Sequence, residues 1–149
     1  MRTVLVHLRN TTEEQVVNFL KRTYTYQAGP PWICDVGGDA CLYINIYRDM
    51  ELESEPESIA NLCNELRCRP TVSISADVSG RHPGDEQVRE FVSILLSQFE
   101  GLAQDEFTEG FWTLDEIRSE CRKPTASGLS GRQEGHSFFD YRDAWKPKP

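Results

Sequence analysis

The sequence predicts an α+β domain that begins with the β-α-β-β-α-β element order of ferredoxin-like folds, with both helices on one face of a sheet. Four short segments alternate apolar and polar residues, which is typical of strands with one buried face. Two segments between them repeat apolar residues at helical spacing, as core-facing helices do. The length of 149 residues fits one domain that can bury a sizeable core.

The first three strands and the first helix have clear local signals. A strand is predicted at residues 3–8, and a capping box at Thr11 and Glu14 then begins a helix. The second and third strands are predicted around residues 32–36 and 42–47, on either side of a Gly-Gly-Asp turn. These segments account for the β-α-β-β part of the order.

The second helix and the fourth strand complete the ferredoxin-like part. A capping box at Ser54 and Glu57 predicts the start of the helix, and Pro70 ends it. Residues 71–78 alternate again and are predicted to be a strand.

Further elements follow this part of the chain. An added helix is predicted after the loop at residues 79–84, because apolar residues recur there at helical spacing. A fifth strand is predicted at residues 102–107, and Thr113 with Glu116 caps a short last helix. We therefore expect a domain at residues 1–121.

The end of the sequence changes in character. Residues 122–135 are polar, small and unperiodic, so we expect a flexible linker. Residues 136–149 contain four aromatic side chains, which are rare in disordered segments. We expect this aromatic tail to dock on the domain or on a partner.

Charge and hydropathy exclude several function classes. The chain has 16 Lys and Arg against 24 Asp and Glu, a formal net charge of −8. Because proteins bind the nucleic-acid backbone mainly through Lys and Arg, we do not expect a nucleic-acid partner. No segment approaches the roughly 20 apolar residues that cross a bilayer, and the N-terminal residues lack a signal-peptide cleavage site. We expect a cytoplasmic protein with no membrane partner.

No metal or cofactor is expected. The five cysteines are an odd number, and their spacing lacks the C-x₂-C pattern of zinc sites, so they are interpreted as buried free thiols. The nucleophile-elbow, zinc-protease and dinucleotide-binding motifs are also absent from the sequence.

Acidic residues are concentrated in two segments. Residues 49–57 carry five acids and no base, and residues 85–120 carry ten acids and two arginines. Such a segment is either a solvated face or a surface that steers a basic partner, with aromatic side chains as central anchors. The predicted partner-binding residues are Asp49, Glu51, Glu53, Glu55, Asp105, Glu106, Glu109, Phe111 and Trp112. Core packing is the alternative interpretation for Trp112.

Two other functions stay open at this point. His82 follows Arg81 in a loop before a helix N-terminus, which makes it the best-placed histidine for acid–base chemistry in a small enzyme or metabolite-binding domain. Tyr43 and Tyr47 share one face of a strand and suit the stacking of RNA bases. The strong acidity of the chain and the lack of a ribonucleoprotein motif argue against the RNA function.

Three stretches of the C-terminal half have a familiar pattern. They are residues 75–85 (SADVSGRHPGD), 111–117 (FWTLDEI) and 135–141 (GHSFFDY). Together with the helix after the first stretch, they resemble small acidic bacterial immunity proteins of polymorphic or contact-dependent toxin systems. The resemblance implies a non-catalytic protein that binds a cognate toxin or effector domain in the cytosol and blocks its active site. A protein of this kind has no catalytic residues and no cofactor.

Overall fold

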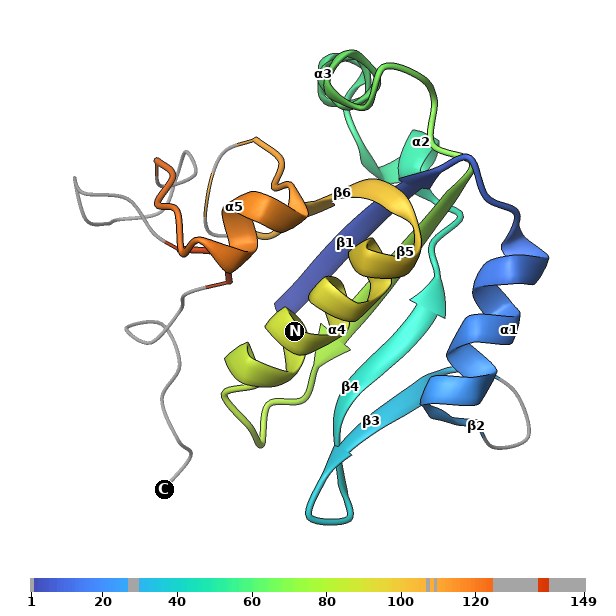
Figure 1. Ribbon diagram of the computed structural model, residues 1–149, viewed down its shortest axis with the longest axis vertical. Coiled ribbons are helices and arrows are strands. Elements are labelled where there is room, and N and C mark those ends of the chain that lie inside the picture. Colours follow the sequence, from blue (N-terminus) through green and yellow to red (C-terminus); the bar gives the residue numbers. More distant parts are fainter. Residues whose placement is uncertain (1, 27–29, 107, 109, 125–136, 140–149) are drawn as a thin grey trace.

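A computed structural model describes residues 2–26, 30–106, 108, 110–124 and 137–139, and it shows an α+β fold built on one sheet (Figure 1). The strands, in chain order, are β1 (Arg2–Arg9), β2 (Thr25–Tyr26), β3 (Trp32–Val36), β4 (Asp39–Ile46), β5 (Val72–Val78) and β6 (Glu100–Gln104). The helices are α1 (Glu13–Thr23), α2 (Met50–Glu53), α3 (Pro56–Leu66), α4 (Asp85–Gln98) and α5 (Leu114–Arg118). The α+β class predicted from the sequence is confirmed.

The strand order differs from a ferredoxin-like sheet. The six strands are arranged β2-β3-β4-β5-β1-β6, and all their pairings are antiparallel. In the split β-α-β unit of a ferredoxin-like sheet, one strand lies between the two strands that a helix connects, whereas here both β4 and β5 separate β1 from β3. The predicted β-α-β-β-α-β order along the chain therefore folds into a different sheet topology.

One face of the sheet, the covered face, carries the main core. The helices α1 and α4 lie on this side (Figure 1), and their apolar side chains pack against the sheet. The alternation of Val4, Val6 and Leu8 along β1 is confirmed, because all three are 0% exposed. The neighbouring strands add Leu42, Ile44, Ile74, Ala76 and Val78, also at 0% exposure.

The second face is covered by α3 at one end. Leu62 and Leu66 of α3 pack with Leu102 and Phe111 in a separate apolar cluster. Leu102 lies opposite His7 in the pairing of β6 with β1, and side chains of adjacent strand residues point to opposite faces. The expectation that both early helices share one face is therefore wrong for α3.

Helix starts follow capping chemistry, with two corrections. Thr12 and Gln15, one residue later than predicted, form the capping box of α1. The unpredicted α2 occupies residues 50–53, so Ser54 ends this helix and does not cap α3. The predicted capping box of Thr113 and Glu116 at the start of α5 is confirmed.

The β6 edge of the sheet is extended by the segment after it. Gly101 lets β6 approach β1 closely, because a Cβ atom there would lie 2.3 Å from the carbonyl oxygen of His7. Ala103 and Trp112 then exchange two backbone hydrogen bonds of 2.9 and 2.8 Å. As a result, Trp112 joins the core of the covered face, while Phe111 joins the cluster around α3.

Part of the aromatic tail completes the covered face. Phe138 and Phe139 are 2% and 0% exposed, and the ring of Phe138 meets Trp112 edge-on at 5.5 Å between centroids. Arg89 of α4 donates a hydrogen bond of 3.2 Å to the carbonyl oxygen of Phe138. The predicted linker from residue 125 onward, residue 136 and the tail beyond residue 139 lie outside the described residues.

Candidate partner-binding surface

The predicted steering residues of the first acidic segment lie on α2 and directly beside it. Asp49 precedes α2, Glu51 and Glu53 lie on it, and Glu55 follows it. All four are exposed. Leu52, between them, is 87% exposed. We call these five residues the α2 surface.

Two side-chain contacts hold α2 against the rest of the domain. The hydroxyl of Tyr47 donates a hydrogen bond of 2.6 Å to the carboxylate of Glu53. Burial, together with this hydrogen bond, raises the pKa of Tyr47 to about 12, so its hydroxyl remains a donor at neutral pH. Glu51 forms an ion pair with Arg69, just after α3. The α2 surface therefore has a defined position although α2 has only four residues.

The second predicted group of binding residues does not form a surface. Asp105, Phe111 and Trp112 are 6%, 6% and 0% exposed, and they pack inside the domain. Glu106 is exposed and accepts a hydrogen bond of 3.0 Å from the backbone N–H of Thr3. Glu109 lies outside the described residues. The alternative interpretation of Trp112, core packing, matches its position.

Asp105 was predicted to bind a partner because it is acidic, but its carboxylate forms hydrogen bonds inside the domain. Its carboxylate accepts hydrogen bonds of 3.0 and 2.7 Å from the backbone and hydroxyl of Thr108, and one of 2.7 Å from the N–H of Phe139. The Thr108 hydroxyl in turn accepts a bond of 2.9 Å from the indole of Trp112. Buried polar groups need such partners, so Asp105 joins the β6–α5 loop to the aromatic tail.

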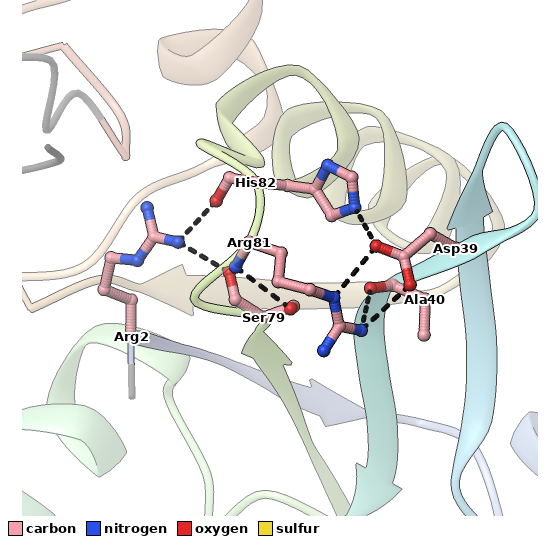
Figure 2. Close-up of polar contacts among 6 residues, drawn as sticks. All are labelled: Arg2, Asp39, Ala40, Ser79, Arg81 and His82. Atoms are coloured by element: carbon pink, nitrogen blue, oxygen red, sulfur yellow. Dashed lines mark hydrogen bonds and ion pairs between the residues drawn. The ribbon is translucent and has the colours of Figure 1, made fainter. Parts of the chain in front are cut away.

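The Arg81-His82 loop is tied to the β3–β4 hairpin through one carboxylate (Figure 2). Nε2 of His82 lies 2.8 Å from Asp39, and Arg81 donates two hydrogen bonds of 2.9 and 3.0 Å to the same carboxylate. The hydrogen bonds from Arg81, followed in size of effect by the one from His82, hold the pKa of Asp39 below its usual range. Arg2 donates to the backbone carbonyls of Ser79 and His82 at 2.9 and 2.6 Å.

This cluster fixes the loop firmly. A carboxylate that orients an imidazole is one part of a catalytic dyad, but a nucleophile or substrate-binding group must lie beside the imidazole as well. The carboxylate of Asp39 is shared with Arg81, which spans from the loop to the hairpin. The contacts seen among the described residues join two loops at the end of the covered face.

His7 is also engaged in the fold. Its Nδ1 lies 2.8 Å from the hydroxyl of Ser73, and its Nε2 lies 3.3 Å from the side-chain oxygen of Gln104. The rings of His7 and Phe111 meet edge-on at 6.3 Å between centroids. Burial lowers the pKa of His7 to about 4, which keeps the imidazole neutral at pH 7.

The cysteines differ in their surroundings. All five are free, as predicted, but the interpretation of the cysteines as buried thiols is confirmed only for Cys41, because Cys34, Cys63 and Cys121 are half-buried and Cys68 is exposed. Burial raises the pKa of Cys34 to about 11, which keeps this thiol protonated at neutral pH. Within the described part of the chain, no group of three or more His, Cys, Asp or Glu side chains could hold a metal ion. Every helix there is too short or too polar to cross a bilayer.

Sequence reasoning missed Leu52, and the structure adds contacts for the tyrosine pair that the sequence could not show. Leu52 follows no apolar period, and a lone leucine between acids was the available signal for it. Tyr43 is half-buried on the second face, while the hydroxyl of Tyr47 is hydrogen-bonded to Glu53. A carboxylate beside Tyr47 opposes the approach of a nucleic-acid phosphate.

Comparison with known proteins gives no relative to guide the assignment. No protein-family model, no curated protein and no solved structure matches this chain.

Proposed function

We propose that the protein is a non-catalytic inhibitor that binds a basic toxin or effector domain in the cytosol and blocks it, as bacterial immunity proteins do. The α2 surface is the observation that carries the proposal. It places four exposed carboxylates around Leu52, which is 87% exposed. The net charge of −8 adds a long-range attraction for a basic partner.

The two kinds of side chain on the α2 surface have different expected roles. Fully burying a leucine side chain contributes roughly 1.5–3 kcal/mol, so Leu52 is suited to hold the partner once it is bound. Carboxylates at the rim of an interface mainly set the association rate and its salt dependence. The α2 surface thus combines steering with one apolar anchor.

The arrangement around His82 supports this proposal over the enzymatic alternative. An enzyme or metabolite-binding domain would use the Arg81-His82 loop, but both side chains are directed to Asp39. The guanidinium of Arg81 and the imidazole of His82, which a small anionic substrate would need for binding, are therefore both engaged by the carboxylate of Asp39.

A test begins with tagged protein used to recover a partner from the source cells at low and then moderate salt. We expect one basic protein to be retained and to be lost when the double variant Asp49→Lys, Glu55→Lys is used, which reverses the charge of the α2 surface without removing the contacts of Glu51 and Glu53. Steering of this kind accelerates association by about 10–10³-fold at low salt, so the variant should associate at least about tenfold more slowly. Expression of the recovered partner alone should arrest growth, and co-expression of the wild-type chain should restore it.

The matched control moves the same charge change to the other side of the sheet. Glu86 and Glu90 are exposed on α4, and the variant Glu86→Lys, Glu90→Lys changes the net charge by the same amount. This control should retain the partner and restore growth. A non-toxic partner, or full rescue by the α2 double variant, would contradict the proposal.

A further inference from the structure

A large part of the second face of the sheet is left open by the described helices. Strand register places its side chains in two rows, Gln104–Leu5–Ser75–Asn45 and Thr3–Asp77–Tyr43–Ile33. All eight side chains are half-buried, whereas most of their neighbours on the covered face are fully buried. We call these eight residues the open face.

The open face is not a uniformly polar surface. An antiparallel sheet with one solvated face usually shows polar side chains on that side. Here Leu5 lies on β1 and Tyr43 on β4, on either side of Ser75 and Asp77 on β5. Aromatic and aliphatic side chains beside small hydrogen-bonding groups are typical of the centre of a protein interface.

Carboxylates border the open face at one end. Asp77 accepts a hydrogen bond of 2.6 Å from the hydroxyl of Thr3. Glu106 accepts one of 3.0 Å from the backbone N–H of the same residue. Thr3 therefore brings two carboxylates together beside β1 and β5.

The α2 surface borders the other end. Tyr47 comes directly after β4, its backbone N–H donates a hydrogen bond of 2.8 Å to the carbonyl oxygen of Ser73 on β5, and its hydroxyl is bonded to Glu53 of α2. Tyr43 lies opposite Asp77 in the register of β4 with β5, and Tyr47 is four residues further along, so the two acidic ends are about 13 Å apart along the strand direction at roughly 3.3 Å per strand residue. A partly apolar floor thus lies between two acidic ends.

A groove continues the open face toward α3. It has a volume of about 360 Å³, and Gln104 belongs both to its wall and to the open face. Asn61, Asn64, Glu65 and Phe111 also line it. Amide and carboxylate oxygens can accept hydrogen bonds from a guanidinium group, which has five N–H donors.

We propose that the open face is the floor on which the basic partner docks, an inference that rests on the function proposed above. The docking element is a polypeptide segment with an uncharged, partly apolar middle and cationic side chains at both ends. The ends are separated by about 13 Å, which corresponds to about nine residues of helix. Acidic groups at both ends select a cationic polypeptide and repel a nucleic-acid backbone.

The test uses two synthetic helical peptides with the isotope-labelled full-length chain. One carries arginine pairs nine residues apart around an alanine–leucine middle, and the other carries the same residues with the pairs four apart. Titration followed by NMR should shift the signals of Leu5, Tyr43 and Ser75 together with those of α2, and the wider spacing should bind more tightly. The side-chain amides of Asn45, Asn61 and Gln104 are additional reporters.

Two serine-to-arginine variants separate the faces. Ser75→Arg places a cation in the centre of the open face and should weaken binding of the wider peptide about tenfold or more. Ser97→Arg on α4 makes the same change on the covered side and should bind like the wild type. Asn45→Arg, at the margin of the open face, replaces Ser75→Arg if that variant does not fold.

The outcomes distinguish this inference from the proposed function. Shifts confined to α2, with wild-type binding by Ser75→Arg, overturn the docking floor and leave the α2 surface as a binding site. Absence of binding by both peptides, or shifts that map to the α1 and α4 side, also overturns the docking floor, whereas the proposed function is decided separately by the recovery of a toxic partner and the growth rescue.

Discussion

Neighbouring side chains along β1 meet very different surroundings. Val4 and Val6 are 0% exposed beneath α1 and α4, whereas Thr3 and Leu5 are half-buried on the face that α3 covers only near His7. Because strand side chains alternate between faces, one strand serves both a core and a surface. The covered face carries the main core, and the open face is the one that we propose for recognition.

The two faces also differ in how they are completed. The covered face is closed by Phe138 and Phe139, which come from the far end of the described chain and are fixed by Asp105 and Arg89. The open face is bordered instead by the exposed α2 and by Glu106. Changes on the first face should therefore affect unfolding, and changes on the second should affect binding.

The largest effect is expected when Phe138, from the C-terminal end of the described chain, is removed from the core of the covered face. Phe138→Ala removes a ring that is 2% exposed and packs on Trp112, so it should lower the free energy of unfolding by about 3–5 kcal/mol. Urea denaturation measures the loss. Leu52→Ala, at a position 87% exposed, is the control and should stay within about 0.5 kcal/mol of wild type. Equal small losses would show that the tail does not stabilise the covered face.

The next effect concerns the buried imidazole of His7. This residue lies on the second face of the sheet, between the part that α3 covers and the open face. The pKa of His7 is about 4 in the folded chain and 6.5 in the unfolded one. The unfolded state therefore binds the proton first, and stability falls as the pH drops from about 6.5 toward 4. The total loss should be about 3 kcal/mol.

Urea midpoints measured between pH 7 and pH 4 check this dependence. The variant His7→Asn removes the titrating group and should show a flatter profile over the same range. A wild-type profile as flat as that of the variant would show that His7 does not carry the effect.

The smallest effect compares two adjacent residues directly. Val6→Ala leaves a cavity in the covered face and should cost about 2 kcal/mol, while Leu5→Ala on the open face should cost less than about 1 kcal/mol. The larger side chain is thus expected to matter less for stability. Binding of the wider arginine peptide should show the opposite order, with Leu5→Ala the weaker binder.

The elements of the covered face could be predicted because their signals are local. The alternation of β1 and the capping box of Thr113 and Glu116 depend on residues a few positions apart. The strand order could not be predicted in this way. The apolar pattern of α3 is compatible with packing on either face of the sheet. Which face Leu62 and Leu66 contact depends on residues distant in sequence, such as Leu102.

The candidate site was predictable to a similar degree. The exposed acids of the α2 surface follow from their composition alone. Asp105 and Trp112 have the residue types of an interface, but Phe139 and Phe138, distant in sequence, contact them in the core. The open face was missed because it depends on which strands are neighbours.

The position of the tail has a consequence for how the protein is made. During synthesis β1 emerges well before its partners β5 and β6 and before the rings of Phe138 and Phe139. Contacts between segments so distant in sequence form slowly, because long loops must close first. A ribosome that stalls before residue 139 therefore releases a chain with an unfinished core and exposed apolar strands. Such chains are recognised by proteases and chaperones, so quality control favours copies that have completed the covered face.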